Sequence, residues 1–425
     1  MTNHSRRQFL RAGASASALA AFQKPRDSFA GECQILSRRF GTEPDFEKLA
    51  DQYSLAEGLS YLNHASIGTM AKPVQKARQK YLEICETNPW FYMWSGAWDQ
   101  AREQVREKVS RLLNCDKSEV AITHNTTEMF NLLANGTPLK PKDEVLFSSL
   151  CHAGASLPFV HHQKHHKQYR VRRFDFPVDM LPELKADDIV NAYREAIRPE
   201  TRMLVIPHID NTVGVRYPLR EIAKMAKAKG VEWVAVDAAQ TVGMLPVDFQ
   251  NSNVDMLATS PHKWLGAPKG IGIAILRKGL NETIAPMWTT WGQDRWSDSA
   301  RRYEDYGTRN LAELLTLGDS IDFLNTINLS QREERLRELW LYTREQVDQE
   351  KSLSWKSPNQ WPLGGSLYSI GVDKKRSVGN LAKSLFKDHQ VVVRPFTTLG
   401  LNHLRVSPNV FTSKAQIARF ISLIR

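Results

Sequence analysis

Residues 233–249 read WVAVDAAQTVGMLPVDF and residues 254–277 read VDMLATSPHKWLGAPKGIGIAILR, and this stretch decides the fold of the 425-residue chain. It contains three short apolar runs. The first ends at Asp237, the second ends before Ser260, and the third follows Gly270. Short apolar runs bounded by turn residues are typical of buried strands. The stretch therefore predicts three strands, two of which lead into residues that can do chemistry.

Lys263 lies in the turn between the second and third of these predicted strands, between His262 and Trp264. A partly desolvated lysine loses its proton more readily and becomes a nucleophilic amine that can form a Schiff base. Asp237, at the end of the preceding strand, is suited to hold a protonated pyridine nitrogen. These two residues would supply the protein's half of pyridoxal 5′-phosphate (PLP) chemistry. The alternative interpretation is that Lys263 is an ordinary surface lysine.

Strand-like and helix-like segments alternate through the middle of the chain, which predicts an α/β domain with a mostly parallel sheet covered on both faces. The predicted strands are residues 120–123, 145–149, 203–209, 233–237 and 255–259, and the clearest helices are residues 127–135 and 219–229, the latter ending at Gly230. Ligands of such sheets bind outside the carboxyl ends of the strands. The residues expected to converge there are Thr126, Thr127, His152, Asn211, Asp237, Gln240, His262 and Lys263.

The length of the chain suits two domains. Helical text follows residue 310, and the chain ends in LRVSPNVFTSKAQIARFISLI (404–424), which indicates a second, smaller α+β domain. We predict that residues 65–310 form the large domain and that residues 31–64 join residues 311–425 in the small one.

The formal net charge of +11 raises the question of a nucleic-acid partner, but residues 1–30 carry +4 of it. The remaining basic residues alternate with acids, as on solvated helix faces, so we expect no nucleic-acid surface. The four cysteines have neither metal-ligand spacing nor the density of a disulfide framework. The histidine-rich run at residues 161–166 indicates an exposed helix face more than a metal site.

The N-terminus indicates export. Residues 5–11 read SRRQFLR and precede a mildly apolar, small-residue stretch at residues 12–22, a pattern that resembles a twin-arginine signal peptide. The apolar stretch is too short and too weak for a membrane span. We therefore expect residues 1–30 to be a signal peptide and linker, with the twin-arginine machinery as a partner and a periplasmic or other extracytoplasmic location. A disordered basic tail is the alternative.

The assembled motifs resemble the class V group of fold-type I PLP-dependent enzymes, from about Tyr61 to the C-terminus. The segments that carry the resemblance are YLNHASIG (61–68), HNTTE (124–128), HIDNTVG (208–214), VDAAQ (236–240) and SPHKW (260–264). The resemblance implies a large domain with a mostly parallel seven-stranded sheet between helices, and a smaller α+β C-terminal domain. It also implies PLP as cofactor, an amino-acid-like substrate and a homodimer with a shared active site.

The resemblance assigns roles around the ring of PLP. Lys263 would form the Schiff base and then serve as the base that removes the Cα proton. Asp237 would pair with the pyridinium nitrogen, and Gln240 and Asn211 would lie near the phenolic oxygen, where uncharged donors suit an anionic acceptor. His152 would stack on the ring.

Further roles concern the phosphate and the substrate. Thr126 and Thr127, at a helix start, would bind the phosphate with help from Ser260 and His262. Thr308, in the segment YGTRN (306–310), would reach the site of the neighbouring subunit. Arg405 would hold the α-carboxylate of the substrate, because a guanidinium can grip a carboxylate through two parallel hydrogen bonds. Arg394 is a further candidate.

The reaction is the least determined part. Desulfurases of this group need a nucleophilic cysteine shortly before the carboxylate-binding arginine, and RPFTTLGLNHL (394–404) has none. The aromatic segment NPWFYMWSGAW (88–98) resembles the isopenicillin N epimerase-like branch instead. Epimerisation, transamination and elimination remain open. The alternatives are a cysteine desulfurase or C–S lyase-like enzyme, and a non-catalytic exported relic of the fold.

Overall fold

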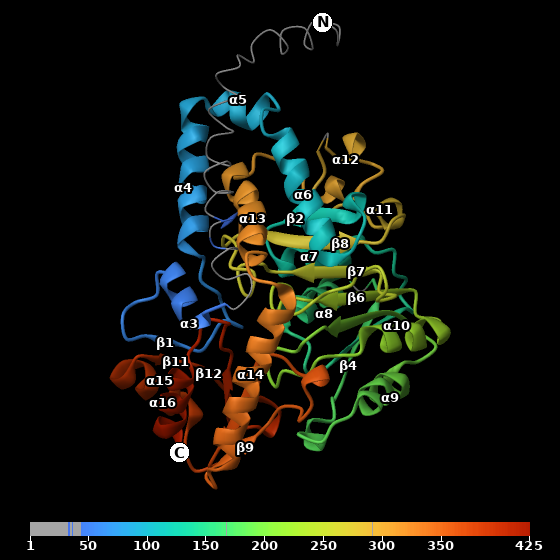
Figure 1. Ribbon diagram of the computed structural model, residues 1–425. Coiled ribbons are helices and arrows are strands. Elements are labelled where there is room, and N and C mark those ends of the chain that lie inside the picture. The colour runs from blue at the N-terminus through green and yellow to red at the C-terminus, as the bar shows by residue number, and fades with distance from the viewer. Residues whose placement is uncertain (1–32, 35, 37–43, 167, 291) are drawn as a thin grey trace, which may run out of the picture.

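The computed structural model describes residues 33, 34, 36, 44–166, 168–290 and 292–425, so the predicted signal peptide lies outside the described residues. A seven-stranded sheet forms its centre (Figure 1). The strands are β2 (Val120–Thr123), β3 (Glu144–Ser148), β4 (Arg170–Phe174), β5 (Thr201–Pro207), β6 (Trp233–Asp237), β7 (Met256–Thr259) and β8 (Gly272–Leu276). Their order is β2-β8-β7-β6-β5-β3-β4, and only β8 runs antiparallel to its neighbours. The predicted α/β class with a mostly parallel sheet is confirmed.

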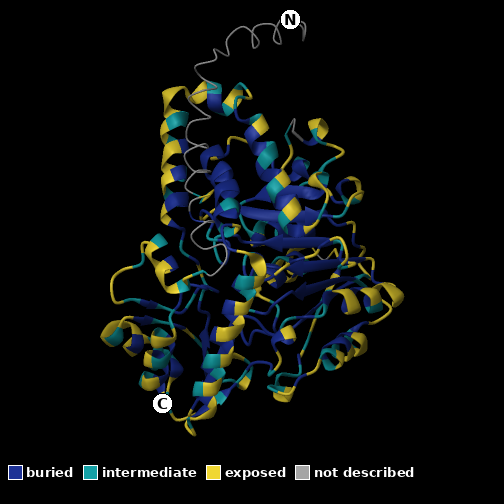
Figure 2. Ribbon diagram, in the orientation of Figure 1, coloured by how far each residue is buried: buried dark blue, intermediate teal, exposed yellow. Residues whose placement is uncertain are grey.

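Alternation along the strands explains why both faces of the sheet are covered. In β5, Met203 and Val205 belong to one buried apolar cluster, whereas Leu204 and Ile206 belong to the other. Side chains of a strand point alternately to opposite faces, so a strand that is apolar at every position requires cover on both sides. Figure 2 shows the strands of this sheet other than β4 as buried, while the outer faces of the surrounding helices are exposed.

Helices form a layer on each face. On one face lie α7 (Thr126–Gly136) and α8 (Ala153–His166), whose apolar residues share a cluster with Met203 and Val205. The helices that contribute to the opposite cluster include α4 (Lys72–Thr87), α6 (Asp99–Leu113), α9 (Ala186–Ala196), α10 (Leu219–Ala228) and α13 (Leu311–Leu324). The short helices are α3 (Phe46–Leu49), α5 (Pro89–Trp94), α11 (Leu280–Thr283) and α12 (Gly292–Arg295).

A second, antiparallel sheet is built from the C-terminal part of the chain. Its order is β12-β13-β10-β9, with strands at β9 (Leu353–Trp355), β10 (Tyr368–Val372), β12 (Arg394–Phe396) and β13 (His403–Val406). Three helices accompany it: α14 (Leu329–Asp348), α15 (Val378–His389) and α16 (Lys414–Ile424). The early strand β1 (Ser60–Tyr61) pairs in parallel with β11 (Val391–Val392), so the N-terminal segment meets the C-terminal part. The expected smaller α+β part is confirmed, while its exact boundaries stay a prediction.

Most predicted element ends fall within two residues of the observed ones. Residues 120–123 and 233–237 are strands as predicted. Helix α7 begins at Thr126, one residue early, because Asn125 is its N-cap and accepts from the Glu128 backbone N–H at 2.9 Å. Helix α10 ends at Ala228, and Gly230 follows with φ +87°, a conformation that favours glycine. The edge strand β4 was missed, since its residues, RVRRF, are polar and only partly buried.

The remaining expectations from composition concern cysteines, histidines and membrane association. Cys85, Cys115 and Cys151 are free thiols. The predicted exposed histidine face is wrong for His162, which is buried and stacks on Tyr169 with ring centroids 5.1 Å apart, while His161, His165 and His166 are exposed. Within the described ranges, no helix has the length and apolar character that crossing a membrane requires.

Candidate active site

The carboxyl ends of five parallel strands meet at one edge of the central sheet, and most of the predicted site residues follow them. Thr126 comes after β2, His152 after β3, Asn211 after β5 and Lys263 after β7, while Asp237 is the last residue of β6. Parallel strands with helical crossovers bring these ends together although the residues are far apart in sequence. This edge of the sheet is the candidate active site.

Lys263 is held in a tight turn. Its backbone N–H donates to the Ser260 carbonyl at 3.2 Å. On the other side the turn contacts Gly68, whose N–H donates to the His262 carbonyl at 2.9 Å. A Cβ on Gly68 would lie only 1.8 Å from the Lys263 carbonyl oxygen, so only glycine allows this approach.

The environment of the Lys263 amine increases the fraction of it that is neutral. Burial lowers the pKa of the amine to about 8, the negative charge of Asp237 opposes this shift, and the positive charge of Arg405 adds to it. An amine with a pKa near 8 is a better nucleophile at neutral pH than an ordinary lysine. The structure therefore provides at Lys263 the property that Schiff-base formation needs.

Asp237 is a buried carboxylate at the end of β6. Its Oδ1 accepts from the Ala239 backbone N–H at 3.0 Å. A buried carboxylate stays charged only where positive charge or hydrogen bonds compensate it. A protonated pyridine nitrogen would supply such compensation, so Asp237 fits PLP.

The start of α7 is suited to an anionic group. The Thr126 backbone N–H donates to Ser260 Oγ at 3.1 Å, and the two hydroxyl oxygens are 2.8 Å apart. Thr127 follows with an exposed side chain. Backbone N–H groups, hydroxyls and the positive end of the helix dipole together favour a phosphate. The predicted residues Thr126, Thr127 and Ser260 therefore lie together and fit the phosphate of PLP.

His152 begins the turn that leads into α8. Its Nδ1 accepts from the Gly154 backbone N–H at 3.0 Å. A Cβ on Gly154 would meet Thr127 Oγ1 at 2.7 Å and His152 Nδ1 at 3.1 Å, so the three residues are neighbours. Burial lowers the pKa of His152, Asp237 opposes the shift, and the positive charge of Lys263 adds to it. An uncharged imidazole is thus favoured beside the lysine, which is compatible with the predicted stacking on the ring of PLP.

Arg405, on β13, reaches the edge of the large sheet. Its guanidinium donates to the Asn211 carbonyl at 2.8 Å, to Asn63 Oδ1 at 2.9 Å and to Ser66 Oγ at 2.6 Å. All three acceptors are uncharged, and no carboxylate of the described residues forms an ion pair with this arginine. Its buried Nε has no hydrogen-bond partner within the described part of the chain. An oriented, buried cation without an anion fits the carboxylate of a substrate.

Gln240 and Asn211 were predicted to lie near the phenolic oxygen of PLP. Gln240 is tied to the protein: its Oε1 accepts from Trp264 Nε1 at 2.9 Å, and its Nε2 donates to the Ala65 carbonyl at 2.9 Å. Asn211 contributes its backbone carbonyl to Arg405. The contacts of these two side chains with PLP stay a prediction. The structure shows that Gln240 joins the turn containing Lys263 and Trp264 to the segment around Ala65.

His262 is partly buried and its Nδ1 has no hydrogen-bond partner among the residues described. Burial, together with the charges of Lys263 and Lys269, lowers its pKa to about 4. A neutral imidazole can still donate one hydrogen bond to a phosphate. The geometry is therefore compatible with the predicted role of His262.

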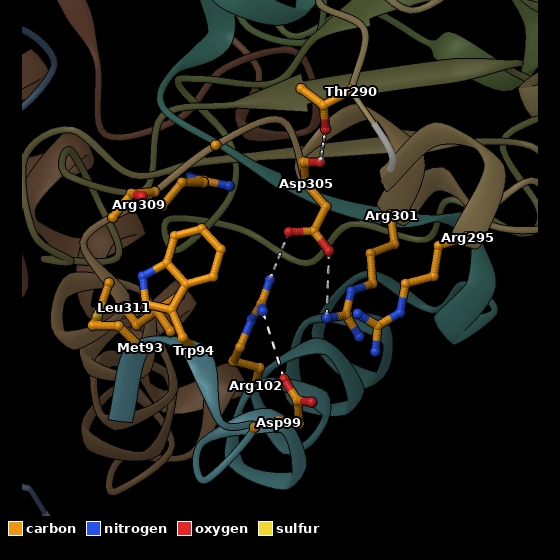
Figure 3. Close-up of a pocket in the computed structure, with 13 residues that line it drawn as sticks. Met93, Trp94, Asp99, Arg102, Thr290, Arg295, Arg301, Asp305, Arg309 and Leu311 are labelled. Atoms are coloured by element: carbon orange, nitrogen blue, oxygen red, sulfur yellow. Dashed lines mark hydrogen bonds and ion pairs between the residues drawn. The ribbon is translucent and has the colours of Figure 1, made fainter. Parts of the chain in front are cut away.

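Thr308 lies elsewhere, on the loop between η4 (Ala300–Tyr303) and α13, and is exposed. It lines a cavity of about 150 Å³ that none of the other predicted site residues lines (Figure 3). Arg102 and Arg301 contact Asp305 in its wall, each at 3.8 Å. Asp305 thus compensates part of the positive charge of these two arginines. The position of Thr308 leaves its predicted role in a neighbouring subunit open.

Sequence reasoning missed residues that hold the site together. Tyr306 donates to Glu128 Oε1 at 2.8 Å and contacts His124 Nδ1 at 2.8 Å, which joins the Thr308 loop to the start of α7. Asp210 is completely buried and accepts three backbone N–H groups. Glu128 and Asp210 both stand inside recognised motifs, and that position was the only signal available.

Comparisons with known proteins agree with this geometry. Residues 53–395 match the family described as Aminotransferase class-V. The chain is 27% identical to the isopenicillin N epimerase of Streptomyces clavuligerus over 73% of this chain and 80% of that protein. It is 26% identical to the isopenicillin N epimerase of Amycolatopsis lactamdurans over 88% of this chain and 96% of that protein.

Solved structures show the same fold. The apo cysteine desulfurase of Thermococcus onnurineus has a TM-score of 0.76, is 22% identical, and is matched over 89% of this chain and 96% of its own. A K223A mutant of the protein C-DES, with glycine covalently linked to its PLP cofactor, has a TM-score of 0.78 at 19% identity, over 88% of this chain and 98% of its own.

Proposed function

Because this chain belongs to the class V aminotransferase family of PLP-dependent enzymes, we propose that it acts at the Cα of an amino acid whose carboxylate Arg405 binds. The observation that carries this proposal is the arrangement around Lys263. A lysine with a pKa near 8 lies at the same edge of the sheet as a buried carboxylate, Asp237, and a buried arginine that has no anionic partner among the described residues.

The side chains of this site divide the work. PLP, when bound, supplies an electron sink for a negative charge at Cα. Thr126, Thr127 and Ser260 hold its phosphate, and Asp237 keeps its ring nitrogen protonated. The neutral fraction of the Lys263 amine, which its lowered pKa enlarges, accepts a proton from Cα. Arg405 fixes the carboxylate and thereby orients the Cα–H bond toward the lysine.

Within this chemistry we favour removal and return of the Cα proton, as in an epimerase, over sulfur transfer. Residues 394–404 contain no cysteine that a sulfur atom could be passed to. Burial and the charge of Asp237 raise the pKa of the Cys151 thiol well above its usual value, so Cys151 is a poor nucleophile. The relatives named isopenicillin N epimerase support the same choice.

Absorbance spectroscopy tests the assignment of Lys263. Wild-type protein with PLP should show Schiff-base absorbance, and borohydride reduction should leave PLP covalently attached to Lys263. Lys263→Ala should show neither. Lys269→Ala removes an exposed lysine six residues away and serves as the matched control. A Lys263→Ala protein that retained the absorbance would refute the assignment. A wild-type protein that gained none with PLP would refute the enzyme hypothesis as a whole.

Incubation of the loaded enzyme with a panel of amino acids in heavy water separates the reactions. Exchange at Cα with inversion identifies an epimerase, and keto-acid formation identifies an aminotransferase. Released sulfide or ammonia identifies a lyase and would overturn our preference for proton transfer.

We further propose that the protein is a homodimer and that it is exported by the twin-arginine route. The resemblance of residues 5–11 to a twin-arginine signal supports export. Replacing both Arg6 and Arg7 by lysine should leave the protein in the cytoplasm, whereas changing the basic residues Lys24 and Arg26 to glutamine should not. Cell fractionation followed by immunoblotting decides, and unchanged export of the Arg6/Arg7 variant would contradict the proposal.

A further inference from the structure

Asp210 closes the loop between β5 and α10. Its Oδ1 accepts from the backbone N–H groups of Thr212 at 2.8 Å and Val213 at 2.7 Å, and its Oδ2 accepts from that of Val215 at 2.7 Å. Its own N–H donates to the Val215 carbonyl at 3.1 Å. The side chain is completely buried. One carboxylate thus fixes the backbone of residues 212–215 around itself.

The loop that Asp210 fixes connects the two sheets. The Asn211 carbonyl accepts from Arg405 Nη1 at 2.8 Å, and the Thr212 carbonyl accepts from Ser369 Oγ at 2.7 Å. Ser357 Oγ donates to the Val213 carbonyl at 2.6 Å. Because Arg405 and Ser369 stand on the C-terminal sheet, the position of that sheet relative to the loop depends on these contacts.

Asp210 is also a source of negative charge for Arg405. Burial lowers the pKa of Arg405 to about 9, the positive charge of Arg394 adds to this effect, and the charge of Asp210 opposes it. No ion pair joins Asp210 and Arg405 in the part of the chain that the structure describes, so the guanidinium keeps donors for another anion. The carboxylate acts on Arg405 at a distance and through the Asn211 carbonyl.

We propose that Asp210 is a positioning residue that holds the Asn211 carbonyl against Arg405 and so sets the orientation in which Arg405 receives the substrate carboxylate. This inference rests on the proposed function. A purely structural Asp210 would change stability only. A positioning Asp210 changes selectivity for carboxylate-bearing ligands while the reactivity of the PLP–Lys263 Schiff base toward other amines is preserved.

Two small oxyamines separate these effects without knowledge of the substrate. Aminooxyacetate and O-methylhydroxylamine both displace Lys263 from PLP, which is seen as loss of Schiff-base absorbance, but only aminooxyacetate carries a carboxylate. The ratio of their second-order rate constants therefore measures what Arg405 contributes. Arg405→Lys, which loses the planar two-point grip, gives the lower reference value.

Asp210→Asn is the main variant. Its amide oxygen can keep the bonds to Thr212 and Val213, but its NH₂ group would face the Val215 N–H and the charge is lost. We expect the ratio to fall roughly tenfold, which corresponds to a loss of about 1.4 kcal/mol in orientation of the carboxylate. Asp210→Ser, which keeps a short acceptor, is the second variant should Asp210→Asn fold poorly, and should lower the ratio as well.

Asp255→Asn is the matched control. Asp255 Oδ2 also accepts a backbone N–H, that of Val234 at 2.7 Å, but at the opposite end of the sheet. The ratio of the two rate constants in Asp255→Asn should equal that of the wild type even if the variant is less stable. Hydrogen exchange of the apoprotein gives a readout without PLP: the amides of Thr212, Val213 and Val215 should exchange faster in Asp210→Asn and unchanged in Asp255→Asn.

The outcomes are distinct. If Arg405→Lys lowers the ratio of the two rate constants but Asp210→Asn keeps the wild-type ratio, the role of Asp210 is overturned. The proposed function then stays intact. A ratio near one in the wild type would overturn carboxylate binding by Arg405, and the inference with it. A wild type that forms no Schiff base would refute the proposed function and the inference together.

Discussion

At Lys263, the burial that makes the amine reactive also destabilises the folded protein. Burial lowers its pKa from 10.5 to about 8, against the opposing charge of Asp237 and with the help of Arg405. The folded apoprotein thus holds this proton less tightly than the unfolded chain does. Below pH 8 the Lys263 amine is protonated in both the folded and the unfolded state. Its buried charge then lowers the free energy of unfolding by up to about 3 kcal/mol.

Lys263→Met should therefore stabilise the apoprotein, and the gain should depend on pH. It should be largest below pH 8 and should disappear as the pH rises from about 8 to 10.5, where the wild type loses the buried charge. Urea unfolding of both apoproteins at pH 7 and pH 10 measures the difference. An equal gain at both values would show that packing, and not charge, limits stability at this position.

At the scale of elements, Glu304 joins helix α6 to β2, the first strand in the order of the large sheet. It accepts from Arg106 Nη2 at 2.6 Å and Nη1 at 2.9 Å, and also from the Ile122 backbone N–H of β2 at 2.5 Å. Burial alone would raise its pKa, but the charge and hydrogen bonds of Arg106, with Arg102, hold the pKa at about 2. A depressed pKa stabilises the fold above pH 4.5 and ceases to do so as the pH falls toward 2.

Glu304→Gln should cost about 3–5 kcal/mol at pH 7, because Arg106 stays buried without its partner. The loss should shrink as the pH falls below 4.5. Glu107→Gln, which removes an exposed pair with Arg111 at 3.4 Å, should cost less than about 1 kcal/mol and is the control. Urea unfolding at pH 7 and pH 4 checks both, and a similar cost for the two variants would contradict the role of Glu304 as a buried link.

At the scale of the whole molecule, Thr308 lies on a surface loop beside a cavity that Lys263 does not line. If two subunits share each site, a mixture of Lys263→Ala and Thr308→Ala subunits forms heterodimers in which one site is defective twice and the other is intact. At a low concentration of PLP, each heterodimer should then form about half as much Schiff base as a wild-type dimer, because only its intact site binds PLP. Titration of purified heterodimers measures this. If Thr308 acts within its own subunit, no site is intact and recovery is absent.

The fold could be predicted largely from local patterns. Strands β5 and β6 are apolar at nearly every position, which only a sheet covered on both faces can accommodate, and α7 follows a strong N-cap at Asn125. The edge strand β4 could not be found in this way because its burial is partial and its residues are charged. Likewise, His162 looked like part of an exposed histidine run, and only its packing on Tyr169 reveals that it is buried.

The sequence by itself determined which chemical groups stand at the ends of the strands: Lys263, Asp237 and the hydroxyls that begin α7. It could do so because strand ends and helix starts depend on neighbouring residues. The tertiary structure decided what these groups touch. Arg405 meets Asn63 across 342 positions of the chain, and Gln240 binds Trp264 and not the solvent. Such contacts depend on how separate elements pack, a non-local property that no local pattern records.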